Sequence, residues 1–308
     1  MSEIHTHYTQ SEEYATFMQK VGWQVIPYEH FVYKRKVPLL GSIIKVPRTP
    51  LKIDYQKLDI LAKKNKALLV KIEPHFVLEN NDKEKALRFL KDQKFSLDNF
   101  PICQTKTILV DLTQKEEQFL KSLRSETRHH LRKSWKQNLL MEIISNDSSP
   151  KAEKILTKFY TLFEKCAKER NFYSPFEKQM KDLWESFKQK ATIILIYEKD
   201  NPEPLSGTLV LTYKNTAYYK YGASIPHGRK KYSSYFLFWE MFKWAHQRNL
   251  KTFDLEGIYD PRYKRTKKYK GFTQFKRGWS KNERTYLGSF SKHYSLPVKF
   301  ISKIGQLI

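Results

Sequence analysis

The sequence predicts an α/β fold on a chain long enough for two domains. Near-continuous apolar runs at 67–72 (ALLVKI) and 107–112 (TILVDL) are typical of strands buried on both faces. Segments with helical spacing of apolar residues alternate with such runs, and this alternation indicates α/β units. The 308 residues are sufficient for two ordinary domains.

The first half begins with an amphipathic pattern that predicts a helix over 11–23. An apolar strand then leads into a rigid Pro-Arg-Thr-Pro turn at 47–50. The remaining predicted elements of this half are strands at 24–27, 31–36, 67–72 and 107–112 and helices at 53–66 and 84–93.

A long stretch without Gly or Pro predicts one helix over 113–138. Thr113 and Glu116 have the spacing of a capping box. Four cations, Arg124, Arg128, Arg132 and Lys136, step by four along this helix. Like charges at this spacing oppose one another by a few tenths of a kcal/mol per pair. An anionic partner would compensate for that repulsion, and a plain solvated face is the alternative.

The stretch NDSSP at 146–150 predicts the joint between two halves. Ser149 can cap the next helix and Pro150 suits its first position. We therefore expect an N-terminal domain at 1–145, joined by the C-terminal segment 288–308, and a second domain at 146–287.

The second half predicts two helices followed by a β-meander. Its strands are expected at 192–198, 207–213 and 217–221, followed by a helix from about Tyr232 and a strand at 252–255.

A basic and aromatic segment follows the last of these strands. Residues 261–281 contain nine Lys or Arg and no acid, with five aromatic rings among them. Disordered segments are poor in aromatics, so these rings predict that Lys276 and Arg277 are held in place. Fixed cations suit a phosphate or an oxyanion, and a basic loop beside a strand is the alternative.

Composition narrows the classes of partner and compartment. The 57 Lys and Arg against 32 Asp and Glu give a formal charge of +25, which favours phosphate-rich or membrane-surface partners. Cys103 and Cys166 are too far apart in the sequence for a CxxC pair or a zinc cluster. No signal peptide or membrane-spanning run is evident, so we expect a cytoplasmic protein.

The sequence shows no convincing pair of catalytic carboxylates, Ser-His-Asp set, Cys-His pair, P-loop or GxGxxG motif. Acyl transfer from an activated ester to an amine needs no covalent enzyme intermediate. It needs positioning and a cation where negative charge develops on the tetrahedral oxygen. A lysine held between aromatic rings can supply that cation.

The order of helices, meander, strand, helix and strand resembles the acyltransferase fold known as GNAT. In that fold an Arg/Gln-x-x-Gly-x-Gly/Ala turn binds coenzyme A. The matching turn here, residues 229–234 (RKKYSS), has larger residues at both small positions. This difference weakens the hypothesis that the chain binds coenzyme A.

Several motifs together resemble the FemABX family. They are IIKVPRTP, LLVKIEP, TILVDLT with SLRSETRHHLRKSWKQN, YYKYGAS with YFLFWEMFKWA, FDLEGI and KGFTQFKRGW. The resemblance implies two GNAT-like subdomains with mixed sheets, no coiled-coil arm, and an acceptor site between the two halves. It also implies transfer of an amino acid from aminoacyl-tRNA to the amino group of a peptidoglycan stem peptide.

The same resemblance implies roles for particular residues. It assigns Lys276 to stabilising the tetrahedral intermediate and Asp111 to the reacting amine, although Asp111 also reads as a strand-end cap. The resemblance places Tyr235 near the acceptor, and the alternative is that Tyr235 is a core residue. The diphosphate of the precursor is expected at Lys34 or Lys36 together with Arg229 or Lys231.

We expect Arg124, Arg128, Arg132 and Arg277 to face tRNA through phosphate contacts. Aminoacyl-tRNA is the expected co-substrate, without a further cofactor or metal, and a monomer is expected. The basic and apolar segment 296–308 either contacts the inner face of a membrane peripherally or packs on the core. Two other functions remain open: an N-acyltransferase that uses an acyl-coenzyme A or other thioester, and a non-catalytic tRNA-binding protein.

Overall fold

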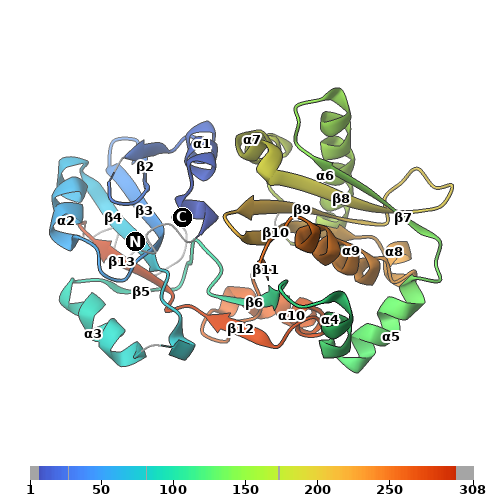
Figure 1. Cartoon of the computed structure of the whole chain (residues 1–308). Coiled ribbons are helices and arrows are strands. Elements are labelled where there is room, and N and C mark those ends of the chain that lie inside the picture. The colour runs from blue at the N-terminus through green and yellow to red at the C-terminus, as the bar shows by residue number, and fades with distance from the viewer. Residues whose placement is uncertain (1–6, 27, 81, 173, 296–308) are drawn as a thin grey trace. The chain divides into compact units, whose positions relative to one another are not determined.

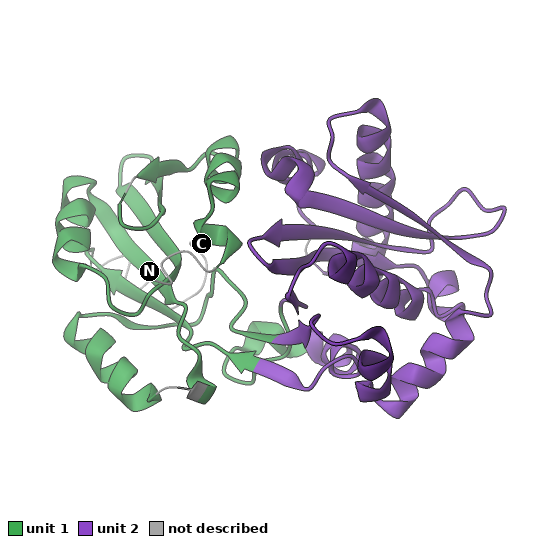
Figure 2. Ribbon diagram, viewed as in Figure 1, with its two compact units in different colours: residues 1–107, 257–268, 284–308 green, residues 108–256, 269–283 purple. Residues whose placement is uncertain are grey.

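The computed structural model describes residues 7–26, 28–80, 82–172 and 174–295. The chain divides into two compact units, each built from segments that are far apart in the sequence (Figure 2). Unit 1 comprises Met1–Thr107, Gly257–Lys268 and Arg284–Ile308, and unit 2 comprises Ile108–Glu256 and Tyr269–Glu283. The expected segment 296–308 lies outside the described residues.

Unit 1 is organised around a six-stranded mixed sheet in the order β1-β2-β3-β4-β13-β5. β3 and β4 are parallel, and the other neighbouring pairs are antiparallel. The strand bounds are β1 Gln24–Ile26, β2 Val32–Val37, β3 Gly41–Thr49, β4 Ala67–Pro74, β5 Ser96–Asp98 and β13 Ser289–His293. β13, from near the end of the chain, thus lies between two strands of the N-terminal part (Figure 1).

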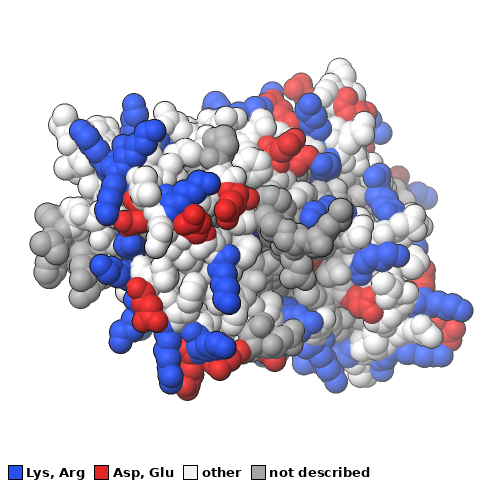
Figure 3. Space-filling view, turned by 60° about the vertical axis from the view of Figure 1, so that its left-hand side comes forward, with Lys and Arg blue, Asp and Glu red and all other residues white. Residues whose placement is uncertain are grey.

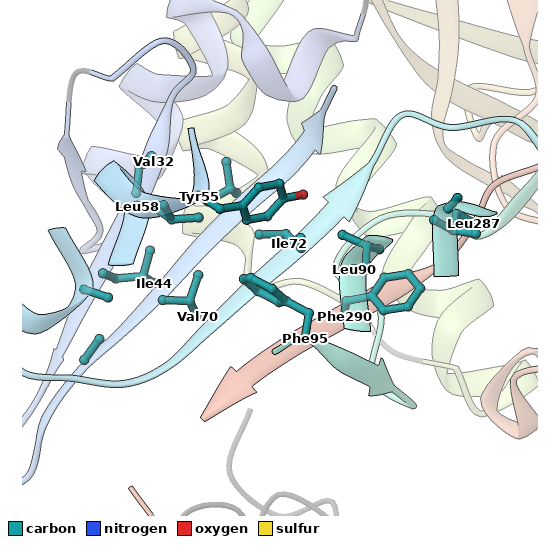
Figure 4. Packing of buried hydrophobic residues seen from close by; sticks show 14 residues of the cluster. Val32, Ile44, Tyr55, Leu58, Val70, Ile72, Leu90, Phe95, Leu287 and Phe290 are labelled. Carbon is teal, nitrogen blue, oxygen red and sulfur yellow. The ribbon is translucent and has the colours of Figure 1, made fainter. Parts of the chain in front are cut away.

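The two faces of this sheet are covered by different helices, because successive side chains of a strand point to opposite faces. Val32 belongs to the core beneath α2 and α3, with Ile44 and Phe290 (Figure 4). The next residue, Tyr33, belongs to the cluster formed with α1 and Trp23. The helices of this unit are η1 Tyr8–Gln10, α1 Glu12–Lys20, α2 Tyr55–Lys64, η2 Leu78–Asn80 and α3 Lys83–Asp92.

Unit 2 is organised around a seven-stranded sheet in the order β12-β6-β11-β10-β9-β8-β7. β10 and β11 are parallel, whereas β7, β8, β9 and β10 form an antiparallel meander. The bounds are β6 Lys106–Asp111, β7 Leu139–Ser145, β8 Ala191–Glu198, β9 Ser206–Tyr213, β10 Thr216–Ser224, β11 Thr252–Asp254 and β12 Asn282–Thr285. The predicted meander and the strand after it are confirmed.

Helices cover both faces of the second sheet, with α6 on one face and α9 on the other (Figure 1). A register shift in β10 between Tyr219 and Tyr221 explains how two tyrosines of one strand serve both helices. Tyr221 contacts Phe163 of α6 and Tyr219 contacts Phe238 of α9, with ring centroids 5.3 and 5.0 Å apart. The helices are α4 Glu116–Ser122, α5 Ser125–Ser134, α6 Pro150–Arg170, α7 Glu177–Phe187, η3 Lys188–Lys190, α8 Pro226–Lys230, α9 Ser233–Gln247 and α10 Lys270–Arg277, with η4 Lys264–Tyr269 before α10.

The start of α6 follows the sequence prediction. The Ser149 hydroxyl accepts a hydrogen bond from the Ala152 backbone N–H at 3.2 Å, and Pro150 is the first helical residue. α6 ends at Arg170 and α7 begins at Glu177, so the chain between them carries no helical arm in its described residues.

The single helix predicted over 113–138 is wrong, because the structure has two helices there. Leu123 and Arg124 are extended, with ψ of 152° and 142°. The Arg124 N–H donates to the Gly278 carbonyl at 3.1 Å instead of continuing the helix. The expected capping box is also absent: the Thr113 hydroxyl donates to Asp111, and α4 begins without a side-chain cap.

The domain boundary expected at residue 146 differs from the division in the structure. Residues 108–145 belong to unit 2, because β6 pairs with β11 in the second sheet through Asp111 and Thr252. The partner that decides the place of β6 lies far along the chain, so local composition around 146–150 did not reveal it.

Within the described ranges, no helix has both the length and the apolar character needed to cross a membrane. On the face shown in Figure 3, Lys and Arg are interspersed with Asp and Glu over the visible surface. Charge alone therefore does not identify a binding surface on this face.

A buried ion pair in unit 1 gives a prediction about stability. The Lys71 side chain is fully buried, its Nζ lies 3.1 Å from Asp98 Oδ2, and it donates to the Phe100 carbonyl at 2.6 Å. Burial lowers the pKa of Lys71 despite the attraction of Asp98. Asp98→Ala should lower the free energy of unfolding by about 3 kcal/mol. This value is at the low end of the usual cost of breaking a buried ion pair, because Lys71 can lose its proton and become neutral.

Urea unfolding followed by circular dichroism measures this effect. Glu117→Ala is the matched control, because it breaks the exposed pair between Glu117 and Lys121 and should cost under about 1 kcal/mol. Equal losses in the two variants would contradict the importance of the buried pair.

Candidate active site

Helix α10 carries Lys276, the lysine predicted to be catalytic. Thr273 and Lys276 are its buried residues, and their spacing by three places them on one face of the helix. The Lys276 residue is only 2% exposed, which is unusual for lysine. Its ammonium group therefore lies inside unit 2.

Lys276 is held between aromatic rings and a backbone carbonyl. Its Nζ lies 4.8 Å from the ring centroid of Phe272 and 5.5 Å from that of Tyr219. It also donates a hydrogen bond to the carbonyl oxygen of Glu256 at 3.4 Å. Glu256 adopts a left-handed backbone conformation, with φ of 58°, just after β11. These contacts combine cation–π attraction with a fixed dipole.

The protonation of Lys276 is shifted by its surroundings. Burial lowers the pKa of Lys276 to about 7, although Glu256 and Asp254 attract the charged form. Near neutral pH the group therefore exchanges between ammonium and amine. A group with such a pKa can both stabilise negative charge and take part in proton transfer.

An aromatic cluster holds α10 against α9. The ring of Phe238 lies 4.8 Å from Phe275 and 5.6 Å from Trp279, measured between centroids. At the end of α10, a side chain at Gly278 would meet the Thr127 hydroxyl, because a Cβ there would lie 2.1 Å from Thr127 Oγ1. Glycine thus permits the close approach of α10 to α5, and the position of Lys276 depends on this packing.

Tyr235 lies beside this cluster and contacts α5. Its ring centroid is 5.1 Å from Phe275, and its hydroxyl is 3.0 Å from Nδ1 of His130. Burial raises the pKa of Tyr235 and lowers that of His130. His130 also stacks on Tyr232, with centroids 5.1 Å apart. Tyr235 is therefore half-buried and hydrogen-bonded.

Asp111 is not brought beside Lys276. It pairs with Thr252 at the start of β11, whereas Lys276 contacts Glu256 beyond the end of that strand. At about 3.3 Å per residue, these two positions on the chain are about 13 Å apart. Asp111 accepts hydrogen bonds from the Thr113 N–H at 2.9 Å and hydroxyl at 2.6 Å, and these bonds lower its pKa. It forms a strand-end cap and lines a separate pocket of about 90 Å³.

Three of the four cations predicted to bind a diphosphate have partners of their own. Arg229 lies 2.6 Å from Glu169 and Lys231 lies 2.8 Å from Glu198. In unit 1, Lys34 donates to Asn65 Oδ1 at 2.9 Å, and Lys36 is exposed.

The four arginines expected to face tRNA fall into two groups. The Arg128 guanidinium donates to the carbonyls of Lys121 and Leu123, which satisfies the end of α4. Arg277 lies 2.5 Å from Glu283. Arg124 and Arg132 are exposed on α5 or at its start, and they remain available as phosphate contacts.

Several residues around Lys276 were not predicted as site residues. Tyr219 and Glu256 lie within the motifs YYKYGAS and FDLEGI, so the motifs marked their segments without revealing their contacts. Asp254 is buried nearby and contributes attraction to the ammonium. In the described part of the chain, no group of three or more His, Cys, Asp or Glu is arranged to hold a metal ion.

Comparison with known proteins supports a transferase fold. The FemAB family model matches residues 195–302, which include Tyr219, Glu256 and Lys276. Over the whole chain, the structure of FemX superposes with a TM-score of 0.78 at 17% sequence identity, covering 96% of this chain and 94% of FemX. The sequence comparison with curated proteins gave no match.

Two further structures show the same fold at lower similarity. The C-terminal domain of a putative lysylphosphatidylglycerol synthetase from Agrobacterium fabrum has a TM-score of 0.62 at 13% identity, covering 96% of this chain and 92% of that one. A tandem GNAT protein from the clavulanic acid biosynthesis pathway has a TM-score of 0.53 at 9% identity, covering 86% of this chain and 83% of that one. The expected fold of two GNAT-like subdomains is thus confirmed.

The lowered pKa of Lys276 predicts how stability depends on pH. Between about pH 7 and the ordinary lysine pKa of 10.5, the unfolded chain binds a proton that the folded chain lacks, so this group makes the protein more stable as pH rises. The unfolding free energy of the unaltered protein should therefore rise relative to that of Lys276→Met by up to about 1.4 kcal/mol per pH unit in this range.

Chemical unfolding of both proteins at pH 6.5, 7.5 and 8.5 measures that difference. Lys165→Met replaces an exposed lysine on α6 and should show the same difference at every pH. A difference for Lys276→Met that does not change with pH would indicate an ordinary lysine pKa.

Proposed function

We propose that the chain is a FemABX-type transferase that moves an amino acid from aminoacyl-tRNA to the amino group of a peptidoglycan stem peptide, and the FemAB family match and the FemX-like fold support this proposal. The acceptor would be a lipid-linked or nucleotide-linked precursor, and the product would contribute to an interpeptide bridge of the cell wall. The family match and the fold support a transferase, and the donor and the acceptor are our proposal.

The environment of Lys276 is the observation that carries this proposal. When the acceptor amine attacks the ester carbonyl, a C–N bond forms and the carbonyl oxygen becomes negatively charged. The ester C–O bond then breaks, and the proton lost by the amine is returned to the departing ribose hydroxyl. A cation buried among rings interacts with the oxyanion more strongly than it would in water.

The pKa of Lys276 suits the proton transfers of this reaction. A group with a pKa near the working pH can give a proton to the leaving oxygen and take one from the attacking amine. No metal or covalent enzyme intermediate is required, because the donor ester is already activated. Aminoacyl-tRNA would serve as co-substrate without a further cofactor.

For the donor, we propose that a surface on α5 binds the sugar-phosphate backbone of the tRNA. The exposed Arg124 and Arg132 would contact phosphates without reading sequence. Arg128 and Arg277 are already engaged with protein groups, so we do not assign them phosphate contacts. For the acceptor, we propose that Tyr235 and the residues near Lys276 line its reacting end.

An alternative proposal for the same fold is acyl transfer from a thioester donor such as an acyl-coenzyme A. The turn that would receive the pyrophosphate of coenzyme A contains Arg229 and Lys231, and both are paired with glutamates. A pyrophosphate would have to displace Glu169 and Glu198 from these cations. This arrangement favours aminoacyl-tRNA over coenzyme A.

Replacing Lys276 tests the proposed mechanism. Lys276→Met should reduce transfer about 100- to 1,000-fold, because it removes one oxyanion-stabilising group. The assay incubates the full chain with a charged-tRNA pool and a muropeptide precursor, and mass spectrometry measures the gain of an aminoacyl group.

Lys165→Met is the matched control and should retain full activity. Transfer at the unaltered rate in Lys276→Met would remove this residue from the mechanism. Transfer from acetyl-coenzyme A, with none from charged tRNA, would replace the proposed function by the thioester rival.

The pH dependence of transfer gives a second test. Below the pKa of a lysine-type acceptor, the neutral amine increases tenfold per pH unit, while above about pH 7 the Lys276 cation decreases by the same factor. The value of kcat/KM for the acceptor should therefore rise up to about pH 7 and then level off.

Lys276→Arg keeps its charge, so its kcat/KM should be lower but should continue to rise through pH 8.5. Initial rates at pH 6.0–8.5 would show the two shapes. A continued rise in the unaltered protein would mean that the charge on Lys276 is not needed for transfer.

A further inference from the structure

Unit 1 contains a second partly buried lysine, Lys45 on β3, which the sequence interpretation did not single out. Within the described residues, the Lys45 side chain makes no hydrogen bond and no ion pair, and its ammonium contacts an aromatic ring. Its Nζ lies 4.6 Å from the ring centroid of Trp23. A lysine that is sheltered from water yet has no carboxylate partner is an exception that calls for an explanation.

A second cation shares the same ring. The Arg35 guanidinium lies 4.7 Å from the centroid of Trp23. The strand register explains this geometry, because Lys45 pairs with Tyr33 and Arg35 lies two residues further along β2, on the same face of the sheet. Trp23 is 9% exposed and provides a fixed wall between the elements that carry the two charges.

The surroundings of Lys45 disfavour its charge. Burial, together with the neighbouring cations Lys71 and Arg35, lowers the pKa of Lys45 to about 8, while Glu73 and Cys103 act in the opposite direction. Lys71 is already paired with Asp98.

The nearby carboxylate of Glu73 is also occupied. It accepts hydrogen bonds from the backbone N–H groups of Ile102 and Cys103, the second at 2.6 Å. Arg35 is exposed and donates to the Val21 carbonyl, and neither Arg35 nor Lys45 has a carboxylate partner among the described residues.

We propose that Lys45 and Arg35 form an oxyanion-binding site against Trp23, which takes a phosphate or a carboxylate of a small-molecule ligand. The ammonium supplies a compact charge, and the guanidinium can bind two oxygens at once. The indole gives an apolar surface for the part of the ligand that carries the anion. A bound anion would offset the repulsion between the cations and favour the charged form of Lys45.

This site deepens the proposed function, on which it rests, by locating an anionic group of the acceptor in unit 1. Peptidoglycan precursors carry both phosphates and peptide carboxylates, so the chemistry is shared by two sources. The site differs from the diphosphate contacts expected at Lys34 and Lys36. Lys34 alternates with Arg35 along β2 and donates to Asn65 near α2, on the opposite face of the sheet.

Calorimetry on the full chain, without tRNA, tests the site directly. Inorganic diphosphate and acetyl-Ala-Ala serve as separate probes for the phosphate and the carboxylate. One of them should bind, and Lys45→Met and Arg35→Met should each weaken that binding at least 10-fold. Lys45→Arg, which retains the cation, should bind within a few-fold of the unaltered protein.

Lys64→Met is the matched control, since it removes an exposed lysine of α2 on the other face of the sheet and should not change binding. Circular dichroism would verify that each variant is folded. Binding of diphosphate alone identifies a phosphate site, and binding of the dipeptide alone identifies a carboxylate site.

The proposal is overturned if neither probe binds, or if Lys45→Met binds as well as the unaltered protein. The proposed function is tested separately. Anion binding at Lys45 together with an absence of aminoacyl transfer would support the binding site and refute the proposed reaction.

Discussion

The burial of the Lys276 ammonium is the constraint on which the organisation of unit 2 depends. An ammonium removed from water is costly unless nearby groups stabilise it. Here the rings of Phe272 and Tyr219 and the carbonyl of Glu256 surround it, and they come from α10, β10 and the end of β11. Aromatic contacts of Phe238 hold α9 against both α10 and β10, and the missing side chain at Gly278 lets α10 approach α5.

Local sequence was enough to predict the elements whose signals are local. The apolar runs at 67–72 and 107–112 are strands, and the Ser149-Pro150 pair begins α6, because burial of a strand and capping of a helix each involve adjacent residues. The break at Leu123 and Arg124 was missed because its cause is distant. The Arg124 N–H donates to the Gly278 carbonyl, and no pattern within 113–138 encodes that partner.

The candidate site shows the same limit for side chains. The aromatic residues near Lys276 in the sequence indicated that the lysine would be held in place, because a segment that buries its rings is ordered. The sequence did not show that Arg229 and Arg277 are paired with Glu169 and Glu283, because ion pairing depends on which acids the fold brings near. Lys45 was missed for the opposite reason: one lysine within an apolar strand resembles an ordinary solvent-facing position.

Pairing therefore says more about function than net charge does. A cation with a carboxylate partner is already stabilised, and a ligand anion must displace that partner before it binds. A buried cation without such a partner is destabilised in the free protein, so an anion that reaches it, whether a bound group or a transition-state oxygen, gains the full interaction. The Lys276 ammonium contacts two rings and a carbonyl and is attracted by Glu256 and Asp254, and the Lys45 ammonium contacts an indole. The excess of basic residues, 57 against 32 acidic, therefore says less about the chemistry than the surroundings of these two lysines do.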